Sequence, residues 1–246
     1  MSTGDARTRG GFPATRHSVI ERIRDGNDDA RREAFGDLIE GYWKPVYKHL
    51  RITWRLTPDD AQDLTQGFFA DAFQKSWLEK FEPGKARFRT FVRVCADRFV
   101  MNARQAASRL KRGGAAQTVA LDFDGAEREI AARPLSAPPE AEELFHQEFV
   151  RALFDNAVRS VRAECERSGR AVHFELFEKY DLAPADDVSY VRLAEQFNLT
   201  TTQVTNYLAL VRRSFREHAL ESLRGLCGSE AEFKREARDL FGMELE

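Results

Sequence analysis

The chain has 246 residues and a formal net charge of −2, with 42% hydrophobic and 32% charged residues. These values are typical of one or two soluble globular domains, and they exclude a protein that is basic throughout. No run of eighteen apolar residues is present and residues 1–24 lack the apolar core of a secretory signal, so we expect a cytoplasmic protein that does not enter a membrane.

The amino-terminal part predicts a short tail followed by helices. Residues 1–11 are small, polar and glycine-containing, and we expect them to be disordered. Residues 12–16 predict an anchored turn before a short helix that runs through Arg24. Apolar residues at helical spacing over 28–51 then predict one or two amphipathic helices, kinked or divided at Pro45.

An acidic helix is predicted from Thr57 to about Leu78. Thr57 and Pro58 have the types of a cap and a first helical residue, and acids follow in the first turn. Residues 57–82 hold six acids against two lysines, a net charge of −4. These carboxylates lack a further ligand nearby, so capping or a protein-binding face is favoured over a metal or acid–base site. The side opposite the apolar stripe carries Asp60, Asp63, Gln66 and Gly67.

A basic helix is predicted next, after a turn at residues 81–85 that contains Pro83 and Gly84. The segment 85–112 contains nine lysines and arginines against Asp97, so its charge is +8 and the rest of the chain carries −10. Its apolar residues keep helical spacing, which leaves a cationic face suited to phosphates and exposed bases. A solvated face on a core helix is the alternative, and the local charge favours nucleic acid. The cationic face is expected to carry Arg89, Arg93, Asn102 and Arg104.

Residues 113–139 are rich in glycine, alanine and proline, and we interpret them as a flexible linker to a second helical group that begins at Glu140. Within that group, residues 189–218 have the pattern of a helix-turn-helix. Its second helix has no acid on the outer face before Glu217, so DNA reading is favoured over a plain scaffold. The residues assigned to DNA on this helix are Thr202, Gln203, Thr205, Asn206, Arg212, Arg213 and Arg216.

The carboxyl-terminal segment, the cysteines and the histidines indicate no catalytic or metal site. Residues 233–241 predict a terminal helix that packs on the second domain, with no function assigned to it. Three cysteines, odd in number and far apart, predict buried free thiols, and the five histidines have no ligand spacing. We therefore expect no metal, no cofactor and no small-molecule substrate, and without a catalytic cluster we do not expect an enzyme.

In their order and spacing these stretches resemble a bacterial RNA polymerase sigma factor of the extracytoplasmic-function group, over residues 34–223. Residues 12–16, 66–69 and 111–114 are similar to a subgroup with a longer amino terminus and carboxyl tail. The main matching residues are Asp60–Gln66 with Phe68-Phe69, Phe81-Glu82-Pro83 with Arg87–Phe91, and Ser189-Tyr190, Leu193-Ala194, Val204, Leu208 and Arg212.

The resemblance implies an all-α protein with two helical domains joined by a flexible linker. Residues 12–112 would be sigma domain 2, 113–139 the linker, 140–224 sigma domain 4 with the helix-turn-helix, and 225–246 a helical extension. The implied activity is transcription initiation: the chain binds core RNA polymerase, recognises both promoter elements and assists DNA opening.

The resemblance also implies roles for particular residues. Asp60, Asp63, Gln66 and Gly67 would bind the polymerase clamp, and the helix-turn-helix residues would bind the upstream promoter element. The chain departs from the group at Gln62, usually Glu, and at Thr205 and Tyr207, where basic residues are common. Contact with the downstream element is assigned to Phe81, Lys85, Arg87, Arg89, Arg93, Asn102 and Arg104.

Two further hypotheses stay open at this point. A polymerase-independent helix-turn-helix transcription regulator accounts for residues 189–218, but not for the acidic helix followed by the basic one. A phosphate on Thr65, with a Ser/Thr kinase or another regulator as partner, would add charge to the acidic helix. The alternative for Thr65, which is favoured, is a hydroxyl that is buried or bonded to a backbone carbonyl.

Overall fold

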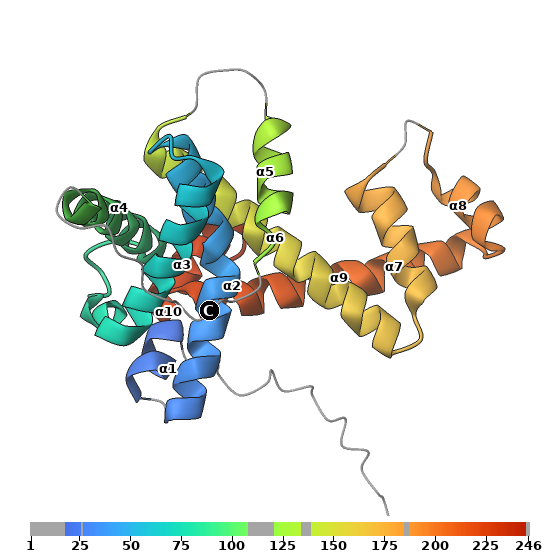
Figure 1. Ribbon diagram of the computed structural model, residues 1–246. Coiled ribbons are helices and arrows are strands. Elements are labelled where there is room, and N and C mark those ends of the chain that lie inside the picture. The colour runs from blue at the N-terminus through green and yellow to red at the C-terminus, as the bar shows by residue number, and fades with distance from the viewer. Residues whose placement is uncertain (1–17, 26, 108–120, 134–138, 185–186, 245–246) are drawn as a thin grey trace, which may run out of the picture.

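The computed structural model describes residues 18–25, 27–107, 121–133, 139–184 and 187–244 (Figure 1). The predicted all-α class is confirmed for these residues, which contain helices and no strand. The predicted disorder of residues 1–11, the basic residues 109–112 and much of the predicted linker lie outside them. The helices are α1 (Val19–Asp25), α2 (Asp28–Ile52), α3 (Pro58–Lys75), η1 (Trp77–Lys80), α4 (Phe88–Ala107), α5 (Phe123–Ala131), α6 (Ala141–Arg167), α7 (Ala171–Phe177), η2 (Glu178–Leu182), α8 (Tyr190–Phe197), α9 (Thr201–Leu226) and α10 (Glu230–Phe241).

The buried apolar side chains form two clusters, which define two lobes (Figure 1). The larger lobe contains α1 to α5, the first half of α6, the end of α9 and α10. The smaller lobe contains the second half of α6, α7, α8 and the first half of α9. Because α6 and α9 lie against each other and run through both lobes, the two cores are joined by continuous helices.

The sequence-based boundary at residues 139 and 140 does not coincide with the division between the lobes. Phe145 and Phe149 of α6 and Leu223 of α9 are buried in the larger lobe, although each follows the predicted linker. Phe149 stacks on Tyr42 of α2 with ring centroids 5.3 Å apart. The larger core is therefore built from residues before and after the linker, because the early helices alone leave an apolar face that α6 and α9 cover.

The linker prediction is wrong for residues 123–131, which form the helix α5. Asp122 caps this helix by accepting a hydrogen bond from the Gly125 backbone N–H at 2.9 Å. Phe123 is buried between Trp43 and Tyr47 of α2, with ring centroids 5.5 and 4.9 Å away. Local composition suggested a loop, but burial of Phe123 and a side-chain cap stabilise a helix there.

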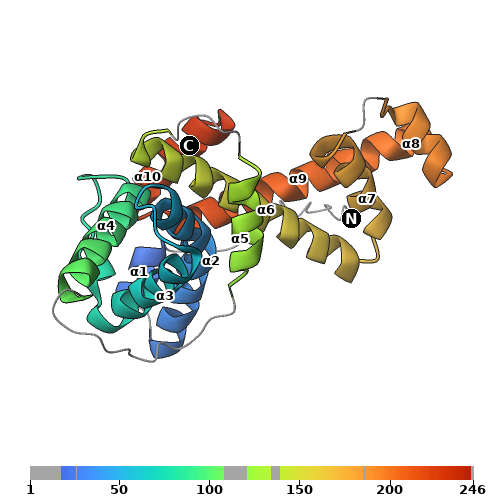
Figure 2. The same ribbon diagram turned by 45° about the horizontal axis from the view of Figure 1, so that its top comes forward.

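Two other expectations about the helices are resolved by packing. The apolar segment 28–51 forms the single helix α2, which continues through Pro45 because Tyr42 and Val46 on either side of it pack into the same core. The terminal helix α10 packs on α9, and Phe241 stacks on Phe154 of α6, so it contacts the predicted second domain. It also belongs to the larger lobe, since Phe233 and Ala237 are buried in the larger core. Figure 2 shows α10 beside α4 and the end of α9.

Candidate nucleic-acid interfaces

The smaller lobe holds α8 and α9 at a fixed angle through local signals in the sequence. Ser189 caps α8 by accepting the Arg192 N–H at 3.3 Å, and Asn198 ends that helix in the left-handed region with φ 53°. Thr200 and Gln203 then form a reciprocal capping box at the start of α9, with bonds of 2.8 and 3.2 Å. The first turns of α9 therefore have a defined position relative to α8.

The outer face of α9 is free for a ligand. Thr202, Asn206, Arg213 and Arg216 are exposed at helical spacing along it, while Val204, Leu208 and Val211 on the inner face are buried. Among the described residues, Asn206, Arg213 and Arg216 form no hydrogen bond or ion pair with another side chain. Two unpaired guanidinium groups and an unpaired amide on one exposed helix face can donate to phosphates and base edges.

Three other residues assigned to α9 have partners of their own. Gln203 uses its side-chain oxygen in the capping box, and the Thr205 hydroxyl donates to the Thr201 carbonyl at 2.9 Å. Arg212 donates two hydrogen bonds to Asp181 of η2, at 2.9 and 3.0 Å, and these bonds raise the pKa of its guanidinium. In this conformation Arg212 ties α9 to η2 and is not a free cation.

The arginines at the start of α4 are neutralised by acids from other helices. Arg87 pairs with Glu236 and Asp239 of α10 at 2.9 and 2.8 Å, and Arg89, which is 8% exposed, also pairs with Glu236. Arg93 contacts Asp97 on its own helix at 2.8 Å and Glu142 of α6 at 2.7 Å. The sequence predicts a cationic face here, but the structure places an acid against each of these arginines.

The remaining residues assigned to the downstream element are divided between core and surface. Phe81 is only 2% exposed and contacts the rings of Phe88 and Phe91, so its ring is not accessible to DNA in this conformation. Lys85 is exposed and pairs with Glu82 at 2.6 Å. Asn102 and Arg104 are exposed near the end of α4, where Arg104 lies over the Trp54 ring.

The acidic helix α3 presents part of its predicted face to solvent. Thr57 caps it by accepting the Asp60 N–H at 3.2 Å, and both Asp60 and Asp63 are exposed. Gln66 is half-buried. Gly67 faces α4, because a Cβ atom there would lie 3.3 Å from the ring of Phe99. Gly67 therefore permits close packing of α3 on α4, and like Gln66 it is only half-exposed.

Thr65 is buried and bonded to a backbone carbonyl, as the favoured alternative to phosphorylation predicts. Its side chain is fully buried, and its hydroxyl donates to the Ala61 carbonyl at 2.6 Å. A kinase needs an accessible hydroxyl, so phosphorylation of Thr65 requires a conformation in which this part of α3 opens. The hydroxyl in the folded helix has the geometry of a Thr that bonds to the carbonyl four residues earlier.

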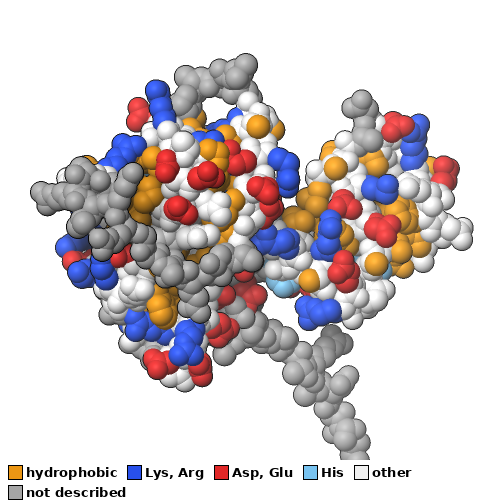
Figure 3. All heavy atoms as spheres, in the orientation of Figure 1, with side chains coloured by type: hydrophobic (Ala, Val, Ile, Leu, Met, Phe, Trp, Pro, Cys, Tyr) orange, Lys and Arg blue, Asp and Glu red, His pale blue; other side chains and the backbone are white. Residues whose placement is uncertain are grey.

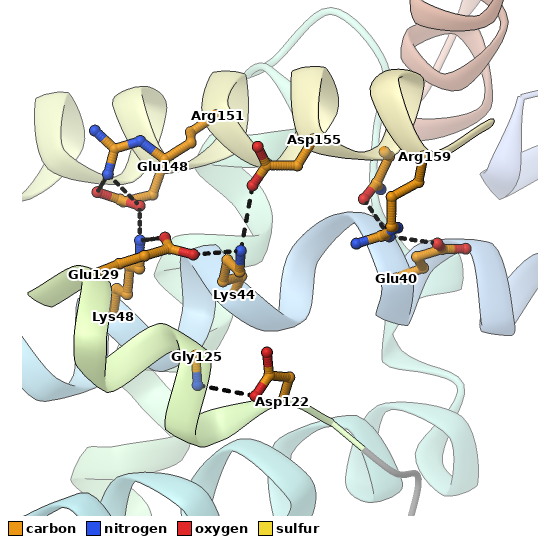
Figure 4. Close-up of polar contacts among 11 residues, drawn as sticks. Glu40, Lys44, Lys48, Asp122, Gly125, Glu129, Glu148, Arg151, Asp155 and Arg159 are labelled. Carbon is orange, nitrogen blue, oxygen red and sulfur yellow. Dashed lines mark hydrogen bonds and ion pairs between the residues drawn. The ribbon is translucent and has the colours of Figure 1, made fainter. Parts of the chain in front are cut away.

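A buried charge network, which the sequence pattern does not reveal, holds α5 and α6 on α2 (Figure 4). The Lys48 ammonium group, 0% exposed, lies 2.5 Å from Glu129 of α5 and 2.6 Å from Glu148 of α6. Lys44 reaches Glu129 at 2.8 Å and Asp155 at 3.2 Å. The lysines lie one helical turn apart on α2, but their partners come from segments about 80 to 110 positions later, at separations that helical periodicity cannot reveal.

Acidification is expected to weaken the attachment of α5. The hydrogen bond from Arg51 holds the pKa of the Glu127 carboxyl below its usual value, at an N–O distance of 2.6 Å. Because the pKa of Glu127 is lower in the folded than in the unfolded protein, its ionised carboxylate stabilises the folded state. This stabilisation is complete above the pKa of about 4.3 that Glu has in an unfolded chain, and it is lost as the pH falls through the pKa of the folded state.

Hydrogen exchange of the α5 amides between neutral and acidic pH measures this effect. We expect the parent to lose protection on acidification more steeply than Glu127→Gln, whose amide does not titrate. Glu142→Gln, which removes a carboxylate from the Arg93 contact on α6, is the matched control and should leave the α5 profile as in the parent. Identical pH profiles for the parent and Glu127→Gln would contradict the assignment.

The charges visible on one face of the molecule are mixed. Figure 3 shows positive and negative side chains interspersed over both lobes in that orientation. Across the part of the chain that the structure describes, no helix is long and apolar enough to span a membrane, and no group of three or more His, Cys, Asp or Glu could hold a metal ion.

No family model matches the chain, and neither a curated protein nor a solved structure is significantly similar to it.

Proposed function

We propose that the chain is a transcription initiation factor that binds core RNA polymerase and directs it to promoter DNA. The proposal rests on the resemblance described above to sigma factors of the extracytoplasmic-function group, and on the geometry of α9. Under this proposal the smaller lobe binds duplex DNA of the upstream element, and the larger lobe binds polymerase and the downstream element. The chain acts through binding and needs no catalytic group of its own.

The observation that carries the DNA part of the proposal is the free outer face of α9. Its exposed Thr202, Asn206, Arg213 and Arg216 lie on a helix whose start is capped and packed on α8. A helix of this kind fits the major groove, where an amide reads base edges and arginines hold phosphates or guanine. The polymerase part is supported by exposed Asp60 and Asp63 at the start of α3, which suit a basic partner surface.

A polymerase-independent DNA-binding regulator is the second candidate, and one observation favours it. The face of α9 is free, whereas the arginines at the start of α4 are paired and Phe81 is buried. A protein that needs only duplex binding has no use for the larger lobe as a second DNA site. Under this candidate, the paired arginines of α4 are structural.

Run-off transcription with core polymerase and genomic fragments tests the proposed function. The expected result is new transcripts from particular fragments that depend on the full chain, together with retention of core polymerase on the immobilised protein. Specific duplex binding without any polymerase binding would establish the second candidate instead. Absence of both activities would refute both candidates.

Substitutions on α9 are expected to separate base reading from phosphate contact. Asn206→Ala should reduce discrimination between specific and base-substituted duplexes by about 1–3 kcal/mol, because it removes an amide that reads a base edge. Arg213→Ala should weaken binding to all duplexes and lower the salt slope by about 1. Fluorescence anisotropy over a range of salt concentrations measures both quantities.

The matched control for Arg213→Ala is Arg167→Ala, which removes an exposed arginine from the end of α6 in the same lobe. It should leave affinity and salt slope close to those of the parent. If Asn206→Ala and Arg213→Ala also bind specific and base-substituted duplexes as the parent does, the assignment of the α9 face is wrong.

A further inference from the structure

The helix α10 carries three of its four carboxylates on the face that meets α4. Glu232, Glu236 and Asp239 are spaced by four and three residues, whereas Lys234, Arg235 and Arg238 lie on other faces of the same helix. At 1.5 Å per residue the three acids span about 10 Å along one side of the helix. These three residues, Glu232, Glu236 and Asp239, form the acidic row of α10.

Each carboxylate of the acidic row engages a group at the start of α4 that would suit a phosphate. Glu232 accepts the Phe88 backbone N–H at 2.6 Å, at the amino-terminal end of that helix, where anions are favoured. Glu236 pairs with Arg87 and Arg89, and Asp239 pairs with Arg87 at 2.8 Å. Arg87 and Arg89 are both residues that the sequence assigns to DNA.

The segment that leads into α10 also covers the aromatic residue assigned to the same site. Gly228 lies so close to Phe81 that a Cβ atom on it would fall 2.1 Å from the ring. Phe81 is buried beneath this contact. Undocking of one carboxyl-terminal segment would therefore uncover an aromatic ring and two arginines together, which is the combination that binds an unstacked base and its phosphates.

The contact between α10 and α4 buries polar groups that lack hydrogen-bond partners. Within the described residues, Nε of Arg89 and Oε2 of Glu236 are buried without a hydrogen-bond partner. Burial also raises the pKa of Glu232, because a charged carboxylate is less stable away from water. A docked state with buried charges and unmet hydrogen bonds is one that a competing polyanion can displace.

We propose that α10 is an intramolecular competitor for nucleic acid, whose acidic row occupies Arg87 and Arg89 until a single strand replaces it. The inference rests on the proposed function and adds its regulation: the larger lobe is closed to single-stranded DNA while α10 is docked. The occupant of this surface is thus residues 228–241 of the chain itself.

Neutralising the acidic row without disturbing its packing tests the proposal. The double variant Glu236→Gln with Asp239→Asn keeps Phe233 and Ala237 in the core but removes two charges from Arg87 and Arg89. The control, Glu230→Gln with Glu244→Gln, removes two charges from exposed acids that pair instead with Arg224 and Arg238. Both variants change the net charge of the full chain equally.

The measurement is binding of the full chain to a short mixed-sequence single-stranded oligonucleotide. We expect the double variant to bind at least about tenfold more tightly than the parent, because a larger fraction of molecules is competent to bind. Its salt slope should be steeper by about 1.4, from two additional phosphate contacts on a single strand. The control should bind as the parent does, and adding Arg87→Ala with Arg89→Ala should abolish the gain.

Asp239→Asn alone provides a second test, because this half-exposed residue can be changed without placing a new group in the core. It should give a smaller gain in the same direction, with an unchanged circular dichroism spectrum. Equal affinity for parent, Asp239→Asn and the double variant would overturn the proposal, and so would an equal gain in the control. Duplex binding through α9 is measured in parallel. If it persists when the single-strand effect is absent, the proposed function survives and only this inference fails.

Discussion

Phe149→Ala is expected to lower the free energy of unfolding of the larger lobe by about 3–5 kcal/mol. Phe149 is 2% exposed and stacks on Tyr42 at 5.3 Å in the larger core. Its removal leaves a cavity between α6 and α2 that the surrounding helices can fill only in part. Denaturant unfolding followed by tryptophan fluorescence measures the change, because all three tryptophans (Trp43, Trp54 and Trp77) belong to the larger lobe.

This measurement also shows whether residues 140–224 fold as an independent domain or contribute to the larger core. If residues 140–224 folded as an independent domain, the tryptophan transition would be the same in parent and Phe149→Ala. Phe154→Ala is the matched control, since Phe154 lies on the same helix but is 36% exposed, and it should cost less than half as much as Phe149→Ala. A tryptophan transition unaffected by Phe149→Ala would show that α6 does not stabilise the larger core.

The helices and their ends could be predicted because their signals are local. Thr57 has the predicted role, since a cap acts within one helical turn. Ser189 and Asn198 bound α8 through equally local contacts. The inner face of α9 follows the same local logic, because its buried apolar residues Val204, Leu208 and Val211 recur at four- and three-residue spacing. These features require only that the chain form a helix and bury one side of it.

The partners of those helices could not be predicted, because they depend on long-range packing. Nothing near Phe123 in sequence indicates that α2 offers it a place between two aromatic rings, so residues 123–131 were assigned to a linker. The spacing of Glu232, Glu236 and Asp239 is visible in the sequence, but not that Arg87 and Arg89 face them.

Long-range packing also explains why the sequence predicts the exposed residues of α9 better than those of α4. On α9 the outer residues meet solvent in the described structure, so a helical wheel alone places Asn206 and Arg213 correctly. On α4 the helix has a second layer around it: α10 and α6 supply acids to Arg89 and Arg93, and Phe81 is covered. A net charge summed along the sequence counts the arginines of α4 but not the acids that fold against them.

Lys48→Met is expected to destabilise the larger lobe by about 3 kcal/mol, the lower end of the range for breaking a buried ion pair. The Lys48 ammonium group is 0% exposed and contacts Glu148, which is 1% exposed, at 2.6 Å. Loss of the lysine leaves this carboxylate buried, with Arg133 at 2.7 Å as its nearest remaining cation. That remaining pair is the reason for choosing the lower end of the range.

A second substitution shows whether the cost arises from the unpaired charge. Lys48→Met combined with Glu148→Leu removes both buried charges and should be more stable than Lys48→Met alone, because apolar side chains of similar size can replace a buried pair at little cost. Lys75→Met, at an exposed pair with Asp71, should change stability by at most about 1 kcal/mol. Denaturant unfolding of the parent, Lys48→Met, Glu148→Leu and the double variant gives the coupling energy between Lys48 and Glu148. If the effects of Lys48→Met and Glu148→Leu simply add, the two charges act independently, and the network joins α2 to α6 by shape and not by charge.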